Sequence, residues 1–99
     1  MGILYPHNVV ASIPLWAYFT RMVLPVQSKM ARAALGWSVR DLAREASVGV
    51  NTVVRFEAGQ VQPIAATLAA IQRAFEAAGI IFIEQDDGGP GVRLATPIQ

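Results

Sequence analysis

The 99-residue sequence predicts a mainly α-helical domain of four to five helices that ends in a short β-hairpin. Apolar residues recur at helical spacing in several segments between about residues 25 and 78. Glycine, serine and proline separate these segments, as expected for turns between helices. Two strand-like segments follow at 80–84 and 91–95, and the loop that joins them is rich in turn-forming residues. The length suits one domain with a small core.

The first two helices are expected at about Pro25–Leu35 and at Ser38–Ala46. In the second helix, apolar residues at i, i+3, i+4 and i+7 form one face, made of Val39, Leu42, Ala43 and Ala46. Ser38 can cap this helix, and Asp41 three residues later completes a pair that resembles a capping box.

The next two helices are expected at about Val50–Ala58 and Ile64–Ala78. Gly49 is a tolerated but weak N-cap for the third helix, and Gly59 fits its C-terminal end. The fourth helix has one apolar face, made of Leu68, Ile71, Phe75 and Ala78.

The link between the second and third helices is very short, Ser47-Val48-Gly49. Two short helices joined so tightly cannot lie antiparallel and pack along their full length, so they are expected to cross steeply. The third helix is then held on the surface. This is helix-turn-helix geometry, in which the second helix of the pair enters a DNA major groove.

Apolar, small and turn residues of this segment agree in register with a known family at Leu35-Gly36-Trp37-Ser38, Leu42-Ala43, Ala46, Val48, Thr52-Val53, Arg55-Phe56-Glu57 and Gly59. On these residues the chain resembles the phage-repressor-like helix-turn-helix regulators, the XRE or Cro/C1-type family. The resemblance covers about 26–78 and is densest at 35–59. It implies a lambda-repressor-like helical bundle. The tail, 77–94, resembles a small bacterial subgroup in which the domain ends in a β-hairpin.

The resemblance implies that the third helix reads double-stranded DNA. Its exposed N-terminal residues are the candidates for contact with base edges, and they are Val50, Asn51, Thr52 and Arg55. Asparagine can form a bidentate pair with adenine and arginine with guanine, and a valine can contact a thymine methyl group. The alternative is that Asn51 and Arg55 are ordinary solvated helix residues.

Candidate phosphate contacts are Ser38, Gly49, Lys29, Arg40 and Arg44. The three basic side chains among them are equally compatible with ordinary surface charges. The register of the family also pairs an arginine of the first helix with a glutamate that ends the reading helix, here Arg32 and Glu57. This ion pair is expected to be a structural device that fixes the reading helix.

Three residues depart from the family pattern. Val39 stands where a phosphate-binding glutamine is common, and Gly49 where the N-cap is often serine or threonine. Ser47 occupies a turn position that is often glycine, so backbone strain is expected there. These departures bear on DNA affinity more than on the fold.

Composition and charge set further bounds. Residues 26–78 carry six basic and four acidic side chains, a formal charge of +2, whereas residues 79–99 carry one basic and three acidic side chains. Weak basicity predicts modest non-specific DNA affinity.

The chain has no cysteine, which fits a cytoplasmic protein. We expect no metal, no cofactor and no enzymatic activity, because His7 is the only histidine and no phosphate-binding glycine loop precedes a helix.

The organisation expected is an apolar extension at 1–21, a DNA-binding domain at 22–79 and a hairpin tail at 80–99. We interpret Met22 as the true start and 1–21 as a wrongly assigned extension; a disordered or interfacial arm is the next alternative, and a membrane anchor the last. The tail, with apolar residues 80–83, is a candidate dimerisation element. It is equally compatible with capping its own core.

Two functions fit this sequence. The first is a sequence-specific transcriptional regulator, a repressor that occupies an operator as a homodimer. The second is a protein-interaction module on the same fold, an antiactivator or an antitoxin. Exposed valines at 39 and 50 would favour the second function, and the polar residues in register on the reading helix favour the first.

Overall fold

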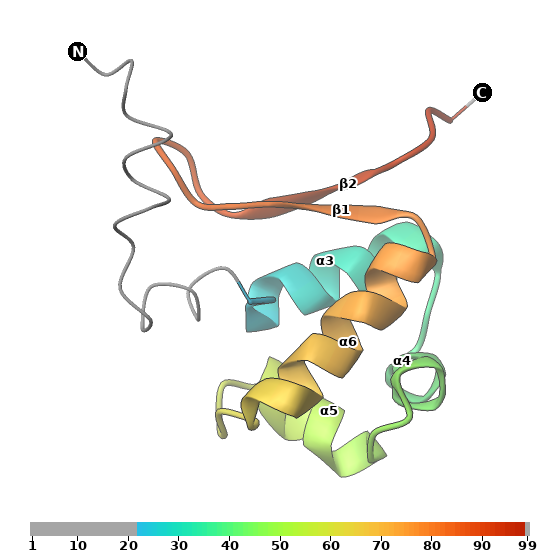
Figure 1. Cartoon of the computed structure of the whole chain (residues 1–99), viewed down its shortest axis with the longest axis vertical. Helices are drawn as coiled ribbons and strands as arrows, with labels where there is room; N and C mark the ends of the chain where they lie inside the picture. Colours follow the sequence, from blue (N-terminus) through green and yellow to red (C-terminus); the bar gives the residue numbers. More distant parts are fainter. Residues whose placement is uncertain (1–21, 99) are drawn as a thin grey trace.

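The computed structural model describes residues 22–98 (Figure 1). Within this range, four helices are followed by two strands: α3 (Pro25–Leu35), α4 (Val39–Ala46), α5 (Val50–Glu57), α6 (Ala65–Ala77), β1 (Ile80–Ile83) and β2 (Gly91–Leu94). The expected mainly α fold with a C-terminal hairpin is confirmed, and the boundaries differ from expectation by about one residue. The expectations about residues 1–21 lie outside the described residues.

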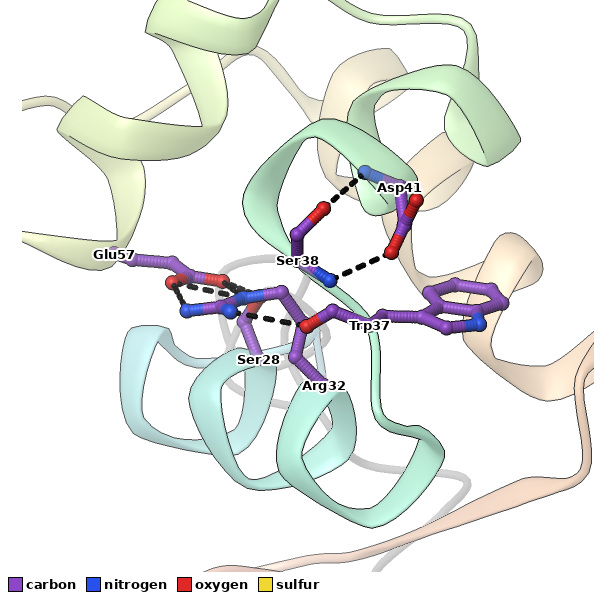
Figure 2. A network of polar contacts seen from close by, with 6 residues as sticks. All are labelled: Ser28, Arg32, Trp37, Ser38, Asp41 and Glu57. Atoms are coloured by element: carbon purple, nitrogen blue, oxygen red, sulfur yellow. Dashed lines mark hydrogen bonds and ion pairs between the residues drawn. The ribbon is translucent and has the colours of Figure 1, made fainter.

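Local sequence explains where α4 begins. Ser38 is its N-cap, and its Oγ accepts a hydrogen bond from the Asp41 backbone N–H at 3.0 Å. The Asp41 carboxylate in turn accepts one from the Ser38 backbone N–H at 2.8 Å, which completes the expected capping box (Figure 2). Gly49 is the N-cap of α5 and, having no side chain, leaves the amides of its first turn uncapped.

The helix-turn-helix link depends on a left-handed residue. Ser47 ends α4 with φ 57° and ψ 44° and is the one non-glycine residue with positive φ among those described. The expected strain is therefore present at this position, because a side chain makes the left-handed conformation unfavourable. Gly36 ends α3 in the same conformation, with φ 70°, and has no such side-chain penalty.

The core lies between the four helices and one face of the hairpin. Its fully buried side chains are contributed by every helix and by β1; the largest are Phe56, Phe75, Leu42, Leu68, Ile71 and Val53. Trp37 stacks on Phe75 with ring centroids 5.7 Å apart, and Phe82 of β1 meets the same ring edge-on at 6.0 Å. Phe75 of α6 thus joins the helical bundle to the hairpin.

The two strands pair antiparallel, with Ile80 opposite Leu94 and Ile83 opposite Gly91. Side chains alternate, so Ile80 is buried on the core whereas Ile81 and Ile83 are exposed on the opposite face. Gln27, buried in α3, donates from Nε2 to the carbonyl oxygens of Ile83 and Gly91, both at 3.0 Å. One amide therefore fixes both strands against α3.

Figure 1 shows the hairpin along one side of the domain, over α3, and α5 on the opposite side. Helices α3 and α6 lie between them. Helix α5 packs against α4 and α3, and α6 packs against α4 and connects to β1. The short helix α5 is therefore free of the hairpin and presents one face to solvent.

Replacing Ser47 by glycine is expected to stabilise the fold. Glycine removes the left-handed penalty but adds unfolded-chain entropy, so we expect a net gain of roughly 0.5–1 kcal/mol in the free energy of unfolding. Urea unfolding followed by circular dichroism measures it. Gly36→Ala is the reciprocal control, because a Cβ there meets nothing within 4 Å and only strain is added. A Ser47→Gly variant that is less stable than the natural chain would contradict this explanation.

Candidate nucleic-acid interface

Helix α5 has a buried face and an exposed face. Val53, Phe56 and Glu57 are buried, while Asn51, Val54 and Arg55 are exposed. The buried residues pack on the core formed by the other helices, which fixes the rotation of the helix about its axis. The exposed set begins in the first turn, the part of a reading helix that reaches base edges.

The four candidate base-reading residues therefore differ in exposure. Asn51 and Arg55 are exposed, one turn apart on the same face, whereas Val50 and Thr52 are half-buried. Val50 packs against the core, and so does Val39 at the start of α4. Both valines were expected to be exposed, but each is half-buried because it packs against the core of its own domain.

Val54 was not among the candidate base-reading residues. It is 48% exposed and lies one turn after Val50 and three residues after Asn51. Its position could have indicated this, because a residue three positions after Asn51 lies on the same side of α5.

The start of α5 offers backbone donors beside these side chains. The first i→i−4 hydrogen bond runs from the Val53 N–H to the Gly49 carbonyl, at 3.2 Å. The amides of residues 50–52 precede that bond and are thus free of helical partners within α5. Because Gly49 is exposed and has no side chain, a phosphate oxygen can approach these amides and the positive end of the helix dipole.

Ser38 is less versatile than the sequence indicated. Its backbone N–H is already bound by the carboxylate of Asp41, so only the hydroxyl hydrogen remains for a phosphate. The backbone hydrogen bond from Ser38, followed by the hydrogen bond from Arg44, lowers the pKa of Asp41 below its ordinary value. Asp41 is thus held as a carboxylate, the form that caps α4.

The candidate basic side chains are all exposed: Lys29 on α3, and Arg40 and Arg44 on α4. Arg44 is partly engaged, since its Nη2 lies 3.0 Å from the Asp41 carboxylate in an exposed i,i+3 pair. Exposed pairs of this kind are weak, so the guanidinium can exchange partners readily.

Glu57, the last residue of α5, is held by an arginine of α3. Arg32 binds the Glu57 carboxylate through Nη2 at 2.6 Å and Nε at 2.9 Å, a bidentate geometry (Figure 2). The Glu57 side chain is only 6% exposed and that of Arg32 21% exposed. Hydrogen bonding to Glu57 raises the pKa of Arg32 above its ordinary value. The structure thus brings this predicted pair together.

Two further contacts complete the network around Arg32. Ser28, fully buried, donates its hydroxyl to the Glu57 carboxylate at 2.6 Å. Arg32 Nη1 donates to the carbonyl oxygen of Trp37 at 3.2 Å, next to the N-cap of α4 (Figure 2). Sequence reasoning missed Ser28, although it lies one turn before Arg32 and so on the same helix face.

The Arg32→Ala substitution is expected to destabilise the domain strongly. It leaves the buried Glu57 carboxylate with Ser28 as its remaining side-chain partner, at a cost of about 3 kcal/mol in the free energy of unfolding. Thermal unfolding followed by circular dichroism measures the loss. Arg44→Ala is the matched control, because it removes an exposed pair and should change the midpoint little. Equal effects of the two variants would show that the buried pair does not hold α5.

Among residues 22–98 there is no group of three or more acidic, histidine or cysteine side chains that could hold a metal ion. No helix in the same range is long and apolar enough to cross a membrane.

Comparison with known proteins agrees with this geometry. A family model described as helix-turn-helix matches residues 29–77, a range that runs from the second turn of α3 to the end of α6. None of the curated proteins compared with the chain matches it. Domains of the matched type bind DNA and are typically non-enzymatic. Residues 29–77 of this chain therefore belong to the helix-turn-helix family of the XRE/Cro/C1 type.

Proposed function

We propose that the chain is a sequence-specific DNA-binding transcriptional regulator, a repressor that acts in the cytoplasm by occupying an operator through α5. The observation that carries the proposal is the pair of exposed side chains Asn51 and Arg55, one turn apart on the solvent face of the second helix of a helix-turn-helix. Amide and guanidinium groups are the side chains best suited to read adenine and guanine edges in the major groove.

Contacts to the DNA backbone would set the orientation of this helix. The exposed Gly49 and the free amides that follow it suit one phosphate, and the hydroxyl of Ser38 suits another. Lys29, Arg40 and Arg44 supply positive charge that attracts the duplex. Repression then needs no further chemistry, because a protein seated on the operator excludes the transcription machinery from the same DNA.

We further propose that the chain binds as a homodimer through the hairpin tail, residues 80–99. One reading helix with few basic neighbours gives weak affinity, whereas a dimer carries two reading helices and can bind DNA multivalently. Ile81 and Ile83 give the hairpin an exposed apolar face, 39% and 42% exposed, although its other face already covers the core. Pairing at the hairpin would leave α5 free, since the two lie on opposite sides of the domain (Figure 1).

The alternative function, a protein-interaction module such as an antiactivator or antitoxin, has less support. It depended on exposed valines at 39 and 50, and both side chains are half-buried against the core of their own domain. That alternative becomes the conclusion only if the DNA-binding experiment fails.

The DNA-binding proposal predicts saturable binding of the full chain to a duplex from the region upstream of its own coding sequence. Fluorescence anisotropy at several salt concentrations measures it. Asn51→Ala and Arg55→Ala should each weaken binding by about 1–3 kcal/mol. Arg73→Ala, which removes an exposed arginine on α6, is the matched control and should change affinity little. Binding no tighter than to random DNA at low salt would contradict the proposal and favour the protein-interaction module.

The dimer proposal predicts that a charge on the outer hairpin face gives a monomer. Sedimentation equilibrium of the full chain should report twice the chain mass, and Ile81→Lys or Ile83→Lys should reduce it to the monomer mass at the same concentration. Ile98→Lys is the control, because Ile98 is 83% exposed but lies beyond the hairpin. A natural chain that sediments as a monomer at micromolar concentration, or lysine variants that remain dimeric, would reject this interface.

A further inference from the structure

We propose that Val54 reads the 5-methyl group of a thymine, so that the preferred half-site contains a thymine close to the bases read by Asn51 and Arg55. The inference rests on the proposed DNA-binding function.

The position of Val54 on α5 is the first observation. A helix turns about 100° per residue, so Val54 lies about 60° around the axis from Asn51 and about 100° from Arg55. All three side chains are exposed, whereas the neighbouring Val53 is fully buried. A groove surface that contacts Asn51 and Arg55 therefore also meets Val54.

The chemistry of an exposed valine is the second observation. Folding does not explain it, because valine is a poorer helix former than alanine and Val54, unlike Val50, is not packed on the core. Val61 and Ile64 are also exposed, but they follow α5 in the loop and at the N-cap of α6. Val54 is thus the exposed valine on the reading helix itself.

In the major groove, the thymine methyl is the apolar group that a base pair presents. Val54 against that methyl removes two apolar surfaces from water. Against the amino group of cytosine or adenine, or the O6 of guanine, the same side chain would displace water without offering a hydrogen bond in return. Val54 therefore favours thymine both by attraction and by the penalty on the alternatives.

The spacing limits where the thymine lies. Val54 is three residues beyond Asn51, which is about 4.5 Å along the helix axis, and Arg55 is one residue further. Successive base pairs are about 3.4 Å apart. The thymine is therefore expected within two base pairs of those read by Asn51 and Arg55.

The test uses the full chain and duplexes selected by it from a random library. In the dominant duplex, each thymine is replaced in turn by deoxyuridine, which lacks the methyl group but keeps every hydrogen-bonding group. We expect one thymine per half-site whose replacement weakens binding of the natural chain about fourfold in anisotropy, the effect of burying one methyl group. Val54→Ala should bind the thymine duplex more weakly and lose this sensitivity.

Val26→Ala is the matched control. Val26 is a valine of similar exposure, 44%, but lies on α3, so this variant should keep the full response to deoxyuridine. Thermal unfolding verifies that the Val54 variant remains folded. Selected half-sites without a nearby thymine, or a deoxyuridine effect of the same size in the Val54 variant, would overturn the inference while leaving DNA binding intact. A library in which no sequence is enriched would overturn DNA reading and this inference together.

Discussion

The bidentate pair between Arg32 and Glu57 is the interaction on which the placement of α5 depends. An eight-residue helix is not stable alone, and a carboxylate at its C-terminal end is unfavourable beside the negative end of the helix dipole. The Arg32 guanidinium neutralises that carboxylate, and the Ser28 hydroxyl satisfies it further. Because Arg32 also binds the Trp37 carbonyl, one side chain joins α3, α5 and the link into α4. The helix-turn-helix is thus held against α3 through Arg32.

In this arrangement, the residues that hold the fold together are different from the outward residues of α5. The inward residues of α5 belong to the core and the ion pair, so its outward residues need no role in folding. On the opposite side, Gln27 ties the hairpin to α3, and Phe75 contacts both Trp37 and Phe82. Substitutions on the outward face of α5 can therefore change recognition with little effect on stability, whereas those at Arg32 or Phe75 affect the whole domain.

Much of this fold could be predicted from the sequence because periodicity, caps and turns are local signals. Ser38 and Asp41 predicted the start of α4, and the glycines and the short link predicted the steep helix pair. Contacts between buried polar groups could not be predicted in this way. Gln27 and Ser28 are polar residues in the first turn of α3, and polar residues are normally expected to face solvent. They are buried because the hairpin and α5 pack on α3. Packing also decides which side chains of α5 are exposed, because Val50 is half-buried whereas Val54 faces solvent.

An NMR titration would show whether the outward face of α5 meets DNA. Amide chemical shifts of the isotopically labelled full chain would be followed as the upstream duplex is added. If α5 reads the DNA, the largest chemical-shift changes are expected at residues 38–39 and 49–55, with smaller changes on the hairpin. The largest changes on β1 and β2, with α5 unaffected, would contradict it.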